Sequence, residues 1–88
     1  MSTAIKKVSN AKAERVFRQF KKHYEGMGYD TSEASLILDW HEGGHPAICW
    51  EGNSPYQWAC GWSNAQDVKG TFCEPYFSYV LVIYPDWN

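Results

Sequence analysis

Residues 9–27 read SNAKAERVFRQFKKHYEGM, and the first element of the fold is specified here. Its apolar side chains recur at helical spacing and cover an arc of about 100° on one side of a helix; they are Ala13, Val16, Phe17, Phe20, Tyr24 and Met27. Ser9 or Asn10 can cap the N-terminus, because a side-chain oxygen there accepts an otherwise unbonded backbone N–H. Gly26 or Gly28 can end the helix in a left-handed conformation. We therefore predict one amphipathic helix over about residues 9–27.

Beyond residue 30 the apolar period changes from about 3.6 residues to 2, which is the period of a β-strand. This alternation predicts strands over residues 34–40, 47–51 and 56–62. A fourth strand can start at 71–73, and the aromatic and β-branched residues of 77–84 predict a strand by composition. In the first strand the alternation places Leu36, Leu38 and Trp40 on one face. Glycine-containing turns separate the first strands, residues 63–70 form a polar loop with a helical turn near 65–68, and Pro75 indicates a sheet edge or a bulge.

These elements predict an α+β fold in which the N-terminal helix packs on a 3–4-stranded antiparallel β-meander. The 88 residues form a single domain, and we expect residues 1–8, ahead of the helix, to be flexible. The segment Tyr79–Ile83 is apolar on both of its faces, whereas one helix covers one face of a small sheet. A second copy of the chain, a partner, or the segment 63–75 would cover the other face; ordinary surface apolarity is the alternative.

Composition indicates a folded protein of a reducing compartment. The chain is 44% hydrophobic and 17% aromatic, which is ample for a core. We find no apolar stretch long enough for a bilayer and no signal-peptide block, so neither membrane insertion nor secretion is expected. Three cysteines, Cys49, Cys60 and Cys73, are an odd number without a Cys-x-x-Cys pair, which favours free thiols in a cytoplasm.

One stretch matches a catalytic motif by its letters. His41-Glu42-Gly43-Gly44-His45 fits His-Glu-x-x-His, in which a helix places two histidines on one zinc ion. The two glycines, the preceding strand pattern and the following Pro46 oppose a helix and favour a turn. A zinc hydrolase through His41, Glu42 and His45 therefore stays a remote alternative. We predict no catalytic cysteine, cofactor or metal site, and no enzymatic activity.

Charge divides the chain into two parts. Residues 1–29 carry a net charge of +5 and residues 30–88 a net charge of −7. Arg15, Arg18 and Lys22 gather on the polar side of the predicted helix, where they could contact nucleic acid. The acidic remainder of the chain would repel a polyanion, so a nucleic-acid-binding regulator is the second hypothesis and a solvated helix face is the simplest explanation.

The acidic part also holds all five tryptophans, and tryptophan and tyrosine are preferred anchors of protein interfaces. We expect Trp62, Tyr76 and Trp87, which lie near loops or the C-terminus, to be partly exposed. Glu51 and Glu74 lie near them and would favour a basic partner. These five residues are the predicted partner-binding residues.

Two segments carry a resemblance. WEGNSPYQWA at residues 50–59, followed by EPYFSY at 74–79 and an apolar strand ending in Tyr84-Pro85, resembles small uncharacterised proteins of actinobacterial tailed phages over residues 47–85. The resemblance implies expression inside a bacterial host and a role in binding or modulating a host protein, without implying an activity. We therefore predict a non-enzymatic interaction protein of the host cytoplasm that forms a homodimer, binds a host protein, or does both.

Overall fold

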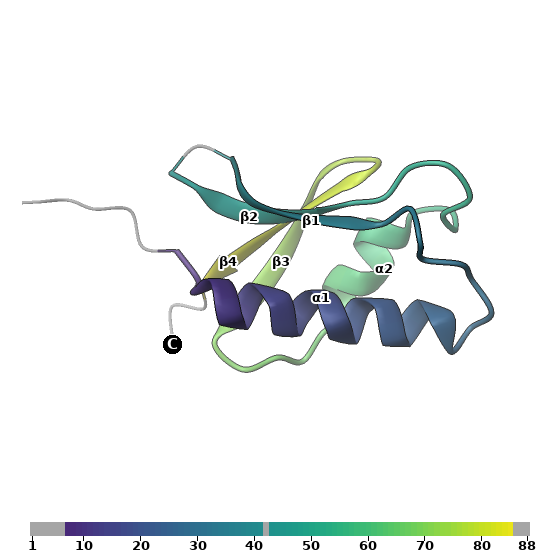
Figure 1. Ribbon diagram of the computed structural model, residues 1–88, viewed down its shortest axis with the longest axis horizontal. Helices are drawn as coiled ribbons and strands as arrows, with labels where there is room; N and C mark the ends of the chain where they lie inside the picture. The colour runs from purple at the N-terminus through teal and green to yellow at the C-terminus, as the bar shows by residue number, and fades with distance from the viewer. Residues whose placement is uncertain (1–6, 42, 86–88) are drawn as a thin grey trace, which may run out of the picture.

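The computed structural model describes residues 7–41 and 43–85, and in this part the chain folds into two helices and one four-stranded antiparallel sheet (Figure 1). In chain order the elements are α1 (Asn10–Glu25), β1 (Ser35–His41), β2 (His45–Cys49), α2 (Trp58–Ala65), β3 (Thr71–Phe77) and β4 (Val80–Pro85). The predicted α+β fold is confirmed, with the N-terminal helix packed on the sheet.

Helix α1 forms where its apolar spacing predicts it, with ends one and two residues inside the predicted range. Ser9 is the N-cap, and its hydroxyl accepts the backbone N–H of Lys12 at 3.2 Å. Gly28 follows the helix in the left-handed conformation, with φ of +94°, while Gly26 stays helical. Of the segment 1–8, expected to be flexible, residues 1–6 lie outside the described part and Val8 is buried in the core.

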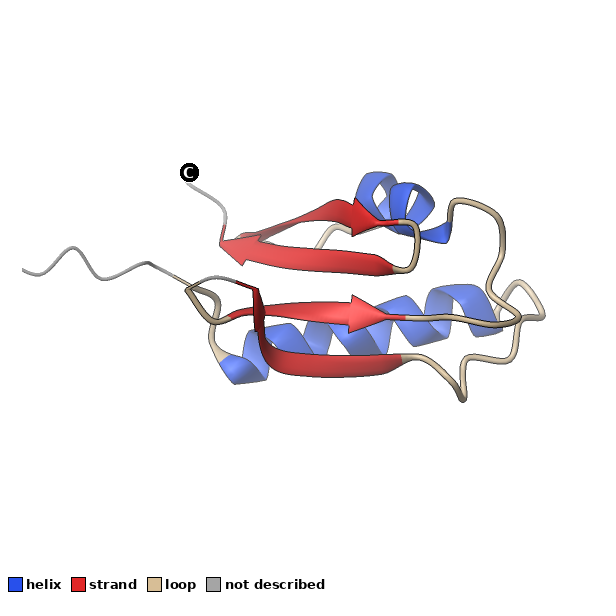
Figure 2. Cartoon of the chain, turned by 90° about the horizontal axis from the view of Figure 1, so that it is seen from above, coloured by secondary structure: helices blue, strands red, loops and turns tan. Residues whose placement is uncertain are grey.

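The four strands lie in the order β1-β2-β4-β3 (Figure 2). The sheet consists of two hairpins, β1–β2 and β3–β4, which are joined by pairing of β2 with β4. The expected meander is therefore wrong at one connection, because β2 pairs with β4 and not with β3, the next strand along the chain. β3 is an edge strand, and its register shifts between Pro75 and Phe77, as the proline predicted. Both helices lie on the same face of the sheet (Figure 2).

The strand predicted over residues 56–62 is wrong, because this segment begins helix α2. The buried residues Trp58, Ala59 and Trp62 follow the spacing i, i+1, i+4 of one helix face, which coexists with the alternation that suggested a strand. Long-range hydrogen bonds hold the helix start: the Trp58 indole donates to the Trp50 carbonyl at 3.1 Å, and the Tyr24 hydroxyl donates to the Trp58 carbonyl at 2.9 Å. Tertiary contacts therefore select the helix.

The main core lies between the sheet and the two helices. Phe20 is fully buried at its centre, with the rings of Tyr24, Trp50, Trp58 and Trp62 at centroid distances of 5.3 to 6.0 Å. Burial of this many large aromatic side chains supplies much of the hydrophobic free energy available to so short a chain.

A bulge in β1 sends Trp40 to the opposite face of the sheet. Between residues 37 and 41, three residues of β1 face a single residue of β2, Pro46, which has no N–H to donate to the ladder. Leu36 and Leu38 pack against the main core as predicted, whereas Trp40 packs on the other face. The prediction that these three side chains share one face is therefore wrong for Trp40.

Candidate interaction surface

The helix-free face of the sheet has a small core of its own. Ala47, Val80 and Val82 are buried there, and Trp40 packs against them. The ring of Trp40, on the edge strand β1, reaches the ring of Tyr76, on the other edge strand, at a centroid distance of 5.2 Å. Aromatic side chains of the chain itself thus cover the middle of this face, so its burial needs neither a partner nor the segment 63–75.

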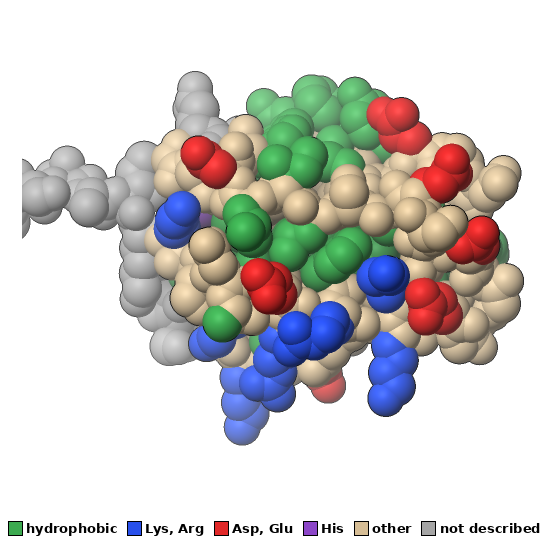
Figure 3. Space-filling model, viewed as in Figure 1, with side chains coloured by type: hydrophobic (Ala, Val, Ile, Leu, Met, Phe, Trp, Pro, Cys, Tyr) green, Lys and Arg blue, Asp and Glu red, His purple; other side chains and the backbone are tan. Residues whose placement is uncertain are grey.

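Tyr76, which provides part of this cover, and the side chains that extend it toward the β3–β4 turn are themselves exposed. The exposed fractions are 50% for Tyr76, 49% for Phe77 and 42% for Tyr79. Phe77 contacts both tyrosines, at centroid distances of 4.6 Å to Tyr76 and 5.8 Å to Tyr79. Figure 3 shows hydrophobic side chains gathered on the side of the molecule away from α1. Together, Tyr76, Phe77 and Tyr79 form a continuous aromatic surface at the β3–β4 hairpin.

Carboxylates lie beside these rings. Glu74 is exposed on β3 and is paired with Val82, so it shares the helix-free face. Burial raises the pKa of the Tyr84 hydroxyl, and the charges of Glu74 and Tyr76 raise it further. Glu51 is also exposed. The backbone N–H of the preceding residue, Trp50, donates to the Tyr79 carbonyl at 3.0 Å, so Glu51 lies beside the β3–β4 turn. We call Glu51, Glu74, Tyr76, Phe77 and Tyr79 the aromatic–acidic surface.

A hollow of about 400 Å³ opens where this surface meets the start of α2. Tyr56, which is 90% exposed, stands at its border, and its wall is largely apolar. The lining residues are Tyr56, Gln57, Ala59, Cys60, Pro75, Tyr76, Phe77 and Ser78. Its size and lining suit an apolar side chain of a bound partner.

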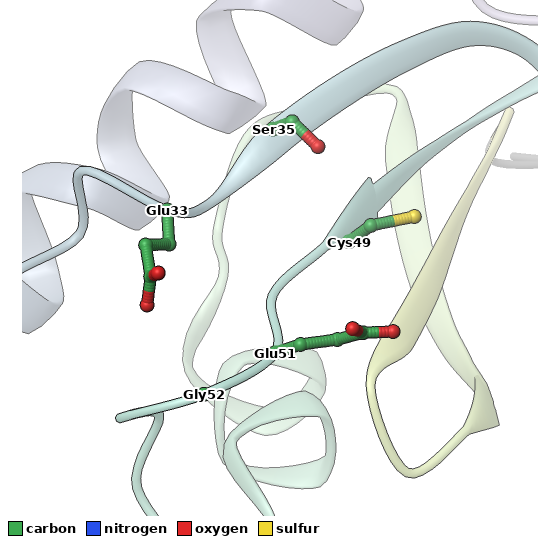
Figure 4. Close-up of a pocket in the computed structure, with 5 residues that line it drawn as sticks. All are labelled: Glu33, Ser35, Cys49, Glu51 and Gly52. Atoms are coloured by element: carbon green, nitrogen blue, oxygen red, sulfur yellow. The ribbon is translucent and has the colours of Figure 1, made fainter.

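A second hollow, of about 410 Å³, lies at the open end of the β1–β2 hairpin, where β1 begins and β2 ends. It is lined by Glu33, Ser35, Cys49, Glu51 and Gly52 (Figure 4). The side chains of Cys49 and Glu51 point toward the β3–β4 hairpin, whereas the Glu33 side chain points toward the backbone at Gly52 (Figure 4). The Glu33 carboxylate lies so close to Gly52 that a Cβ there would come within 2.7 Å of it. The two carboxylates therefore do not converge, and the hollow extends the acidic border of the aromatic–acidic surface.

The structure brings together three of the five predicted partner-binding residues: Tyr76, Glu51 and Glu74. Trp62 was expected to be partly exposed, and this is wrong: its exposed fraction is 3%, because α2 turns it into the core. Trp87 lies outside the described residues. Sequence reasoning missed Phe77 and Tyr79, although Ser78 between them is a turn residue and could have marked a hairpin tip.

The basic residues of α1 lie on the other side of the molecule. Arg15, Arg18 and Lys22 are all exposed, and Figure 3 shows Lys and Arg side chains gathered over α1. Because they are three and four residues apart, they form one row along the helix. We call these three residues the basic row.

The His-Glu-x-x-His match has no helical geometry. His41 ends β1 and is paired with His45 at the start of β2, with Gly43 and Gly44 between them at φ of +83° and +80°. The predicted turn is confirmed, and Glu42 lies outside the described residues. Within the described part of the chain, no group of three His, Cys, Asp or Glu side chains is placed to share a metal ion.

The cysteines differ in their surroundings. Burial raises the pKa of the Cys73 thiol to about 12, and burial followed by the charge of Glu51 raises the pKa of Cys49. Both shifts favour the protonated thiol, which is a poor nucleophile and a poor metal ligand. Cys60 is exposed at the hollow beside α2.

Comparison with protein-family models, with curated proteins and with solved structures finds no match to this chain. Among the described residues, neither helix has the length and apolar character that a membrane span requires. The function must therefore be inferred from the surfaces of the molecule itself.

Proposed function

We propose that this chain is a non-enzymatic protein that acts by binding another protein through the aromatic–acidic surface. The observation that carries the proposal is the exposure of Tyr76, Phe77 and Tyr79 side by side, next to the carboxylates of Glu51 and Glu74. Large aromatic side chains are the commonest interface anchors, and surrounding charges select the partner. The partner would contribute basic side chains and one apolar side chain for the hollow beside Tyr56.

The mechanism we propose is occlusion. The aromatic side chains occupy a binding site on the partner, and the carboxylates increase the rate of encounter with a basic surface. The resemblance to proteins of actinobacterial phages supports a bacterial host protein as the partner and the host cytoplasm as the location.

Affinity capture from a bacterial lysate tests the proposal when it compares matched variants. Phe77→Ala/Tyr79→Ala removes two anchors of the surface, and Met27→Ala removes an apolar side chain that is 61% exposed beyond the end of α1. We expect the first variant to lose the proteins that the native chain captures and the second to retain them. Equal capture by both variants, with unchanged circular dichroism spectra, would contradict the proposal.

A second candidate function is supported by the exposure of the basic row. Arg15, Arg18 and Lys22 could grip phosphates, so the chain would be a nucleic-acid-binding regulator. Filter binding of DNA and RNA at two salt concentrations tests it. Salt-sensitive retention that Arg15→Gln/Arg18→Gln abolishes would support this function, and retention that does not depend on salt or on these arginines would eliminate it.

A further inference from the structure

We propose that the basic partner of the aromatic–acidic surface is a second copy of this chain, whose basic row docks there in a head-to-tail arrangement. The inference rests on the proposed function, because it names an occupant for the same surface. It follows from the placement, chemistry and dimensions of two surfaces that one chain carries on opposite sides.

The placement is set by the fold. Helix α1 packs against the face of the sheet that carries Ile48 and Leu81, so its exposed basic row points away from the sheet. The aromatic–acidic surface belongs to the other face, with Glu74 opposite Val82. Figure 3 shows basic side chains on the α1 side and hydrophobic side chains on the opposite side. One chain therefore cannot join its own two surfaces, whereas two copies can.

The chemistry of the two surfaces is complementary. Arginine and lysine pack their methylene groups and their charge on aromatic rings, and they pair with carboxylates at the ring edges. The chain already makes one such contact, since Lys21 Nζ lies 5.6 Å from the centroid of the Phe17 ring. Helix α1 stays net basic despite Glu14 and Glu25, because it carries five lysines and arginines.

The lengths of the two surfaces differ by no more than side chains can span. From Arg15 to Lys22 the basic row spans about 10 Å of helix, at about 1.5 Å per residue. Glu74 lies two strands away from Ala47, and Glu51 is four residues beyond Ala47. At about 4.8 Å between strands and about 3.3 Å per residue, the backbone positions of these two glutamates are about 16 Å apart. Long, flexible side chains at both ends of the basic row can bridge the remaining difference.

A twofold arrangement of the same surface is disfavoured. It would bring Glu51 and Glu74 of both copies together, and like charges placed opposite each other in an interface are costly. Head-to-tail contact instead places each carboxylate near an arginine or lysine. Such a contact leaves one surface free at each end, so assemblies grow with concentration unless they close into a ring.

Sedimentation velocity across a concentration series tests this on the full chain. At about 0.1 M salt we expect the mass to rise at least twofold above the 10.1 kDa of one chain. At about 1 M salt, where the Debye length falls from about 10 Å to about 3 Å, we expect the monomer. A monomer at both salt concentrations overturns the inference, and so does assembly that salt does not weaken.

Two blocked variants separate head-to-tail from twofold contact. Arg15→Glu/Arg18→Glu reverses two of the three charges of the basic row, and Glu51→Lys/Phe77→Ala reverses one charge and removes one ring of the aromatic–acidic surface. We expect each variant alone to be monomeric and their equimolar mixture to form a dimer and nothing larger. Dimers of either variant alone, or a mixture that stays monomeric although both variants keep the native circular dichroism spectrum, overturn the inference.

Fluorescein-labelled oligolysine distinguishes this inference from the proposed function. If the native chain is monomeric but binds oligolysine, and Glu51→Lys/Phe77→Ala does not, the surface takes a basic partner other than a second copy. The inference then fails and the proposed function stands. If all variants bind oligolysine equally and none assembles, both fail.

Discussion

Replacing Phe20 by alanine should remove a large part of the stability of this protein. The side chain is fully buried, and five aromatic rings lie within 6.0 Å of its centroid. Truncating a buried phenylalanine to alanine typically costs about 3–5 kcal/mol, since the transfer free energy is lost and a cavity remains. With rings on several sides, the cavity cannot close by a small movement, so we expect the upper half of this range.

An 88-residue domain has a free energy of unfolding of about 4–13 kcal/mol. Phe20→Ala therefore removes about a third or more of this free energy and lowers the Tm by at least about 16 °C, at about 4 °C per kcal/mol for a domain of this size. Urea unfolding followed by circular dichroism measures the free energy by linear extrapolation. Tryptophan fluorescence is less suitable, because the substitution changes the surroundings of three indoles directly.

Phe77→Ala is the matched control, because it is the same substitution at a side chain that is 49% exposed. We expect it to cost about 1 kcal/mol, in proportion to the smaller apolar area that folding buries there. If Phe20→Ala costs no more than Phe77→Ala, with equal dependence on urea, then Phe20 is not the centre of the core and our account of the packing is refuted.

Three further predictions concern local contacts. Tyr24→Phe should lower the free energy of unfolding by about 1–2 kcal/mol, because the Trp58 carbonyl at the start of α2 loses its buried donor. In the Tyr24→Phe background, Gly61→Ala should be more favourable by at least about 0.5 kcal/mol, because a Cβ at Gly61 would lie 3.0 Å from the Tyr24 hydroxyl. Additive free energies of urea unfolding in this double-mutant cycle would argue against the contact. Ser9→Ala should lower the free energy of unfolding by about 1 kcal/mol through loss of the N-cap, while an unchanged value would mean that water replaces the hydroxyl. Burial raises the pKa of the Cys73 thiol to about 12 in the folded chain, above the ordinary thiol value of about 8.5. Between these two pH values only the unfolded chain loses this proton, so the free energy of unfolding falls by about 1.4 kcal/mol per pH unit. Urea unfolding of the native chain and of Cys73→Ala from pH 8 upward measures this, and parallel plots of unfolding free energy against pH for the two would contradict the assignment.

Much of the architecture was predictable, because it depends on local periodicity. The spacing of Val16, Phe20 and Tyr24 requires a helix with one apolar side, and Ser9 marks where that helix begins. The alternation in β1 and the apolar run of β4 require strands, and Pro75 requires an edge or an irregularity. Each of these inferences uses only neighbouring residues. The structure agrees with them except at two points: Trp40 leaves the predicted face of β1, and the strand predicted over 77–84 divides into the end of β3, a turn and β4.

The candidate site was predictable only in part. Tyr76, Glu51 and Glu74 could be anticipated, since they lie near turns in an acidic and aromatic part of the chain. Trp62 could not be placed, because the same letters satisfy a strand period and a helix period. The exposure of Phe77 and Tyr79 depends on where the β3–β4 hairpin turns, and within residues 77–84 only Ser78 interrupts the apolar pattern at that turn.

Residue order by itself specifies a small α+β protein with a basic amphipathic helix and an acidic, aromatic remainder. The helix over residues 58–65, the pairing of β2 with β4 and the position of Trp40 on the helix-free face emerge only when the elements pack together. A periodic pattern specifies which side chains share a face within one element. Contacts between distant elements, such as the Tyr24 hydroxyl on α2 and the bulge opposite Pro46, then decide between patterns that the local sequence satisfies equally well.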